Sequence, residues 1–132
     1  MPYELQMVLA TTAILFVLLM YQGALVPITH GFSWGLGSRD AARMPSVMQA
    51  RAQRTIANHL ESMALFVPMA LIASFLQVST AATVWGSAIY VIGRLAFAGF
   101  YLGGVPVLRS VAWGISVTGL VMVAVELLGG RV

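Results

Sequence analysis

The sequence IANHLESMALFVPMALIASFLQV, residues 56–78, is apolar enough to cross a bilayer as a helix, yet it carries a carboxylate and an amide. About 20 helical residues cover the roughly 30 Å hydrocarbon core of a bilayer. A carboxylate in such a helix costs on the order of 2.5 to 3.5 kcal/mol on insertion scales. We therefore expect Glu61 to face the protein interior and to have a partner there.

Three further apolar stretches of similar length surround this one, at Leu5 to Ile28, Ala81 to Leu102 and Val105 to Leu128. The chain of 132 residues is 60% hydrophobic and 8% charged, against roughly 25% charged for a soluble domain. The first stretch follows no basic segment and exceeds a signal peptide's apolar run, so we expect a retained helix. The sequence predicts one all-α domain over residues 1–132, an integral membrane four-helix bundle with up-down-up-down topology.

The connections between these helices differ in length. Residues 29–48 hold glycines, a proline and mixed charge, and we expect a long loop there that forms a small cap. Residues 77–80 leave room only for a tight turn, and Gly103, Gly104 and Pro106 separate the last two helices. Pro68 lies inside the second helix and predicts a kink.

All seven basic residues are arginine, and their positions are uneven along the chain. They flank the first and third connections at Arg39, Arg43, Arg51, Arg54, Arg94 and Arg109, whereas Arg131 lies on the opposite side. The positive-inside rule then predicts a multi-pass membrane protein with both termini outside the cytoplasm. No basic run interleaves with exposed aromatic residues, so we expect no nucleic-acid partner. The chain has no cysteine, and no histidine pair predicts a metal site.

Polar side chains fall on one face of each of the last three helices. At about 100° per residue, one sector of roughly 100° collects Arg51, Arg54, Asn58, Glu61 and Ser62, whereas His59 points away from it. The next helix carries Tyr90, Arg94, Phe97 and Tyr101 on one side, and the last carries Arg109, Trp113 and Ser116. Three helices therefore direct arginines toward a common depth.

Two interpretations of these faces remain open. Glu61 pairs with Arg94 or Arg54 to hold the bundle together, or the polar faces bind a ligand. Glu61 is the only acid at this depth, beside four arginines, and the surplus positive charge favours an anion. A small zwitterion, with carboxylates for the arginines and an ammonium for the glutamate, matches this pattern, and glutathione is such a molecule.

The spacing Arg51-Ala-Gln-Arg54-x-x-x-Asn58-x-x-Glu61, followed by Phe66, resembles the second-helix signature of the membrane-associated proteins in eicosanoid and glutathione metabolism, the MAPEG family. Gly93-Arg94 with Tyr101, then Pro106 and Arg109-Ser110, is similar to the family's third and fourth helices. The match covers the chain in length and helix order. This resemblance implies a homotrimer of four-helix subunits that binds glutathione between neighbours.

Further residue roles follow from the resemblance alone. It implies that Arg109 stabilises the thiolate of glutathione and that the cofactor ligands are Arg51, Arg54, Asn58, Glu61, Arg94 and Tyr101, with Glu61 on the γ-glutamyl ammonium. The chain differs from many members at Ala64 and Leu65, where a proline is common, and from the prostaglandin-forming branch at Phe97 and Trp113. These differences argue against an eicosanoid synthase.

Two functions are consistent with this pattern. The first is a glutathione-dependent transferase or peroxidase that acts on lipophilic electrophiles entering from the bilayer. The second is a non-catalytic relative that uses the same bundle as a structural or accessory membrane subunit. The expected setting of either is a bacterial inner membrane, and the expected partners are two further copies of the chain, the lipid bilayer and a lipophilic small molecule.

Overall fold

The structure is a computed structural model that describes residues 1–129, so Arg131 lies outside the described residues. Within them, four helices are long and apolar enough to cross a membrane: α1 (Tyr3–His30), α3 (Val47–Phe75), α4 (Ala81–Leu102) and α5 (Pro106–Leu128). A fifth, short helix, α2 (Phe32–Leu36), follows α1. The predicted all-α four-helix architecture is confirmed for the described residues.

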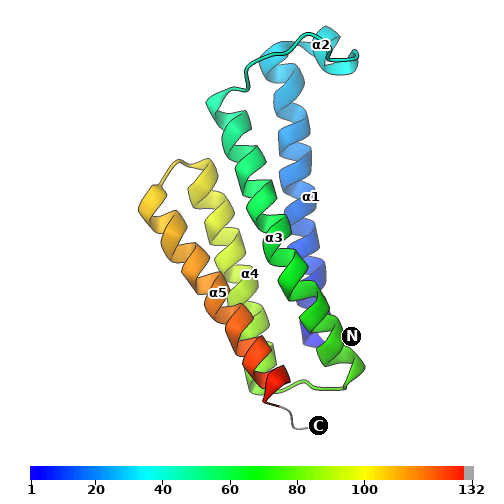
Figure 1. Cartoon of the computed structure of the whole chain (residues 1–132), viewed down its shortest axis with the longest axis vertical. Helices are drawn as coiled ribbons and strands as arrows, with labels where there is room; N and C mark the ends of the chain where they lie inside the picture. Colours follow the sequence, from blue (N-terminus) through cyan, green and yellow to red (C-terminus); the bar gives the residue numbers. More distant parts are fainter. Residues whose placement is uncertain (130–132) are drawn as a thin grey trace.

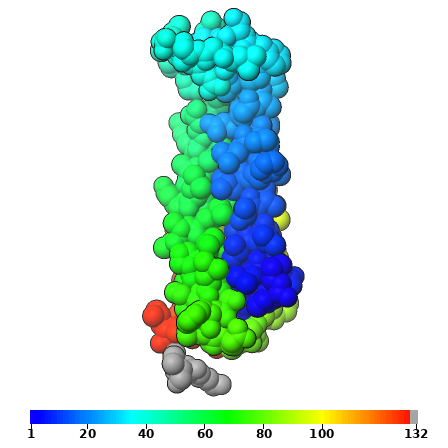
Figure 2. Space-filling view, turned by 90° about the vertical axis from the view of Figure 1, so that its right-hand side faces the viewer, coloured from blue at the N-terminus to red at the C-terminus, as the bar shows by residue number. Residues whose placement is uncertain are grey.

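The helices form two antiparallel pairs. Figure 1 shows α1 beside α3 and α4 beside α5, with α2 at one end of the molecule and the start of α1 near the opposite end. Figure 2 shows α1 and α3 in contact along their length. The α4–α5 pair ends well short of α2, so the first pair projects beyond it (Figure 1).

Local sequence signals set the helix boundaries. The side chain of Ser46 accepts from the backbone of Gln49, and the Gln49 side chain accepts in return, which starts α3 nine residues before the predicted apolar stretch at Ile56. Thr80 and Thr83 cap α4 in the same way. Pro106 occupies the first turn of α5, and Pro68 lies inside α3 as predicted.

Glycines allow α4 and α5 to pack closely. A Cβ atom on Gly93 would lie 2.6 Å from the backbone nitrogen of Ser116, a distance that no real side chain tolerates. Gly86 lies against the carbonyl of Gly119 in the same interface. Because Arg94 follows Gly93, this contact also fixes where the arginine leaves α4.

Glu4 anchors the start of α1 to the turn between α3 and α4. The carboxylate is buried and accepts hydrogen bonds from the hydroxyls of Ser79, at 3.0 Å, and Thr83. These contacts tie the two helix pairs together at the end opposite α2.

Candidate functional site

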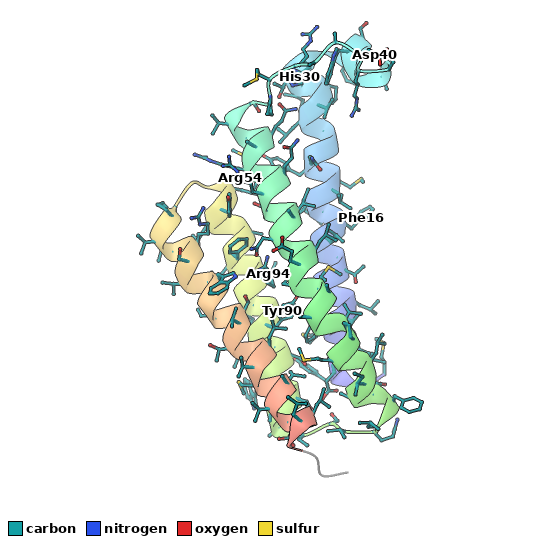
Figure 3. All side chains as sticks on the ribbon, in the orientation of Figure 1. Phe16, His30, Asp40, Arg54, Tyr90 and Arg94 are labelled. Atoms are coloured by element: carbon teal, nitrogen blue, oxygen red, sulfur yellow. The ribbon has the colours of Figure 1, made fainter. Side chains whose placement is uncertain are left out.

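Five polar side chains meet in the middle of the bundle, where hydrocarbon alone would be expected. They come from α1, α3 and α4 and are Thr11, His59, Ser62, Tyr90 and Arg94. All five are buried, and we call them the buried polar network. Figure 3 shows Tyr90 and Arg94 pointing from α4 toward α3. Polar groups at such depth require partners, because each unpaired group in hydrocarbon costs on the order of 2 kcal/mol or more.

Arg94 determines the protonation pattern of His59. The Nε of Arg94 donates to Nδ1 of His59 at 3.3 Å, and because arginine only donates, Nδ1 carries no proton. The remaining proton of the neutral ring is therefore on Nε2, which lies 2.9 Å from the backbone carbonyl of Thr11 and donates to it. His59 thus connects α4 to α1 through two hydrogen bonds.

The hydrogen bonds of the network's hydroxyl groups also have defined donors and acceptors. Ser62 donates its only hydroxyl proton to the carbonyl of His59 at 2.7 Å, so Tyr90 must donate to Ser62 across 2.9 Å. Thr11 then donates to the phenolic oxygen of Tyr90 across 3.3 Å. Phe66 stacks on the Tyr90 ring with centroids 4.2 Å apart and fixes its orientation. Every hydroxyl proton in the network therefore has an acceptor.

A pocket of about 200 Å³ opens beside this network and shares Ser62 and Arg94 with it. We call it the Glu61 pocket, and its lining residues are Asn58, Glu61, Ser62, Leu65, Arg94, Trp113, Ser116, Val117 and Leu120. Its charged and amide groups come from α3 and α4, whereas α5 contributes Trp113, Ser116, Val117 and Leu120. Glu61 is exposed in the single chain, contrary to the expectation that it faces the interior.

Two atoms of the Glu61 pocket lack hydrogen-bond partners. Among residues 1–129, three buried side-chain nitrogen or oxygen atoms have none: Asn58 Oδ1, Ser87 Oγ and Arg94 Nη2. The first is an acceptor, the third is a charged donor, and both belong to residues that line this pocket. Because buried polar groups are normally paired, Asn58 and Arg94 each carry an unsatisfied polar group at the edge of this pocket.

A second pocket of about 200 Å³, which we call the arginine pocket, lies where α3 meets the α4–α5 turn. Its lining residues are Arg51, Arg54, Phe100, Tyr101, Gly104, Val105, Pro106 and Arg109. Gly104 has a φ of 72°, and a side chain there would collide with the Arg51 guanidinium, which reaches the carbonyl of Leu102 at 3.4 Å. Figure 3 shows Arg54 pointing away from α3 on the side of the α4–α5 pair.

Alternating cations and aromatic rings connect the two pockets along α4. The Arg94 guanidinium lies 4.4 Å from the Phe97 ring centroid, Phe97 lies 5.5 Å from Tyr101, and the Arg109 guanidinium lies 4.6 Å from the Tyr101 ring. Such contacts hold guanidinium groups in place without neutralising their charge. These four side chains, from Arg94 to Arg109, form one continuous strip along the predicted polar faces of α4 and α5.

The seven predicted site residues divide between the two pockets. Asn58, Glu61 and Arg94 line the Glu61 pocket, and Arg51, Arg54, Tyr101 and Arg109 line the arginine pocket. The contacts of Arg94 do not fit the alternative of a structural ion pair with Glu61. The Nε of Arg94 binds His59, and its Nη2 has no partner.

Sequence reasoning missed His59 and Thr11. The histidine lies about 100° from the predicted polar face, so helical periodicity excluded it from the site. Burial of Arg94 required an acceptor on a neighbouring helix, and that requirement was the available signal. Among the described residues, no group of three or more His, Cys, Asp or Glu side chains is placed to hold a metal ion.

Comparison with known proteins agrees with this architecture. The sequence model of the MAPEG family matches residues 7–129, which include most of α1, all of α3, α4 and α5, and both pockets. A search of curated proteins found no match. Since the family match spans nearly the whole sequence, the chain belongs to the MAPEG family of membrane proteins.

Proposed function

We propose that this protein is a glutathione-dependent membrane transferase or peroxidase that acts on lipophilic electrophiles. The observation that carries the proposal is the pair of unpartnered buried atoms on residues that line the Glu61 pocket, Asn58 Oδ1 and Arg94 Nη2, together with the exposed carboxylate of Glu61. MAPEG membership provides the link to glutathione and eicosanoid metabolism.

The side chains of the two pockets match the functional groups of glutathione. Glu61 and the Asn58 carbonyl accept hydrogen bonds and suit the γ-glutamyl ammonium. Arg51 and Arg54 suit carboxylates, because guanidinium groups bind carboxylates through paired, charge-assisted hydrogen bonds. The strip from Arg94 to Arg109 joins these two sets of groups.

Glutathione itself supplies a thiol, and the thiolate is the nucleophile in its reactions. The chain's part is to hold positive charge beside that sulfur and to exclude water from it. Arg109 is the proposed source of this charge, and its guanidinium is held on the Tyr101 ring. The exposed indole of Trp113 and the side chain of Leu65 provide an apolar wall of the Glu61 pocket for a greasy electrophile.

Exposure of Glu61 and Arg54 supports a homotrimer. Both side chains lie at the surface of the single chain, on a helix that crosses the membrane. Charged groups facing lipid are costly, and a neighbouring subunit over the two pockets would remove them from lipid. Native mass spectrometry in detergent should therefore detect three chains. A monomer that still binds glutathione would contradict the shared site.

Binding and chemistry are tested on the same protein. Glutathione at 100 times its dissociation constant should stabilise the protein by about 2.7 kcal/mol. Arg109→Leu should retain this stabilisation but lose the ultraviolet absorbance of the bound thiolate and the turnover of a model electrophile. Glu126→Gln, at the far end of α5, is the matched control.

The result also decides between the two functions. An unchanged melting temperature up to millimolar glutathione would favour the non-catalytic, accessory role. If Arg109→Leu keeps both the thiolate signal and turnover, thiol activation belongs to another residue, and Arg94 is the next candidate.

We further propose that residues 31–46 face the cytoplasm and that both termini lie outside it, because the arginines gather near that end. Cysteines introduced at Ser38 and Gln77, which lie at opposite ends of the bundle, should react with an impermeant reagent from opposite sides. Reaction of Ser38→Cys in intact cells would reverse the orientation.

A further inference from the structure

The segment between α1 and α3, residues 31–46, builds a pocket that has no part in the site described above. We call this segment the cap, and Figure 2 shows it at the top of the molecule, above α1 and α3. The cap pocket has a volume of about 360 Å³, and its lining includes His30, Ser33, Trp34, Arg39, Asp40 and Arg43. Figure 3 shows His30 and Asp40 at this end.

Trp34 organises the cap pocket. Its indole nitrogen donates to the carbonyl of Ala41 at 2.7 Å, which folds the segment back on itself. The guanidinium groups of Arg39 and Arg43 each lie 5.8 Å from the indole ring centroid. Both guanidinium groups therefore lie near one ring, and their two positive charges favour an anion in the pocket.

Charge within the cap is unbalanced. Asp40 is its only acid, and a Ser38 hydroxyl donates to the Asp40 carboxylate at 2.8 Å. The Nε of Arg39 donates to the carbonyl of Gly35 at 3.0 Å, which leaves the rest of the guanidinium free to turn toward the pocket. Two arginines against one aspartate leave a net positive charge in the pocket.

Exposed apolar side chains place the cap at the bilayer surface. From Leu5 to Ile28, α1 is about 36 Å long at roughly 1.5 Å per residue, slightly more than the roughly 30 Å core. The apolar surface of α1 continues past its end, because Ile28, Phe32 and Leu36 are 76%, 69% and 84% exposed. The arginines and the tryptophan follow immediately, at the level where headgroups begin.

We propose that the cap binds the headgroup phosphate of an anionic phospholipid between Arg39 and Arg43, with Phe32 and Leu36 among the acyl chains of the same leaflet. The occupant follows from complementarity, because the cap carries a positively charged pocket beside the exposed apolar side chains of Phe32 and Leu36, and an anionic lipid supplies both matching parts. Binding here is independent of glutathione.

Tryptophan fluorescence tests this proposal directly. In Trp85→Phe/Trp113→Phe, the remaining Trp34 reports on the cap, whereas Trp34→Phe/Trp113→Phe leaves Trp85, an exposed residue near the opposite end, as the matched control. Both proteins are placed in mixed vesicles of phosphatidylglycerol and phosphatidylcholine. Two sets of vesicles are compared. In one set only phosphatidylglycerol carries bromine, and in the other only phosphatidylcholine does, in both cases on the part of the acyl chain nearest the headgroup. Quenching then measures which lipid contacts each tryptophan.

Brominated phosphatidylglycerol should quench Trp34 at least about twofold more than brominated phosphatidylcholine at the same mole fraction, and Trp85 should show no preference. Arg39→Gln/Arg43→Gln should abolish the preference, and Asp40→Asn should increase it. If the double arginine variant does not fold, the lipid comparison and Asp40→Asn still decide.

Three results would overturn the proposal. Equal quenching of Trp34 by the two lipids would show that the cap does not select anionic lipid. A preference that survives Arg39→Gln/Arg43→Gln would assign it to other groups. Loss of the preference in millimolar inorganic phosphate at constant ionic strength would identify the pocket as a site for soluble phosphate.

Discussion

Polar groups on the two sides of α3 differ in whether they have hydrogen-bond partners. On the side toward α1, His59 and Ser62 belong to a network in which Arg94 Nε, the histidine ring and three hydroxyls all have partners. On the side toward α5, the Asn58 carbonyl and the Arg94 Nη2 have none, and Glu61 is exposed. One arginine takes part in both regions.

This contrast distinguishes polar residues that stabilise the bundle from polar residues that are available for binding. A closed network compensates its own desolvation and fixes the orientation of its members. Open donors and acceptors gain their compensation only when something else arrives, either a ligand or a neighbouring subunit. The paired Nε of Arg94 therefore positions the unpaired Nη2, and substitutions on the two sides of α3 should have different consequences.

The largest effect should come from His59→Leu. This change removes the acceptor of Arg94 Nε and the donor to Thr11, and it leaves a buried cation with one more unpaired nitrogen. We expect a loss of on the order of 2 to 4 kcal/mol in the free energy of unfolding. Denaturation in mixed detergent micelles measures it.

Leu60→Ala is the control for His59→Leu, because Leu60 is the next residue of α3 and its side chain is 47% exposed. It should leave stability nearly unchanged. His59→Gln retains an acceptor and a donor and should recover part of the lost stability. If His59→Leu is as stable as the parent protein, the network does not hold the bundle together.

Glu61→Gln should show the opposite profile. The residue is exposed and lies on the open side, so the fold without ligand should tolerate the change. Loss of a charge-assisted contact, worth about 1.5 to 3 kcal/mol, should weaken glutathione binding about tenfold or more. Calorimetric titration measures the affinity, with Glu126→Gln as control. A large loss of stability without ligand would show that Glu61 stabilises the fold itself.

The sequence predicts the fold well because the bilayer leaves few alternatives. Length and hydropathy identify four spans, and their order gives an up-down bundle. The start of α3 was harder to predict, because Val47 to Thr55 is too polar for a span and depends on the capping box at Ser46 and Gln49. The close packing of α4 on α5, at Gly93 against Ser116, needs a helix register that no single stretch of sequence contains.

For the candidate site, helical periodicity grouped the polar residues on one face of each helix, and the seven predicted site residues line two pockets. Their division into two pockets depends on how α5 packs on α4, a tertiary property. Periodicity also set His59 aside because it points away from Glu61. Its role follows from Arg94, which lies 35 positions later in the chain.

The smallest effect should come from Tyr90→Phe, which sharpens the comparison within the closed network. The ring still stacks on Phe66, and only the phenolic link between Thr11 and Ser62 is lost. Interhelical hydrogen bonds in membrane proteins contribute about 0.6 kcal/mol on average. We expect a loss of that order in the free energy of unfolding and no change in glutathione affinity, because Tyr90 does not line the Glu61 pocket. A double-mutant cycle with Thr11→Val isolates the link, and a coupling energy near zero would show that the Thr11–Tyr90 contact adds nothing to stability. If Tyr90→Phe instead weakens glutathione binding as much as Glu61→Gln does, the network and the pocket are not separable.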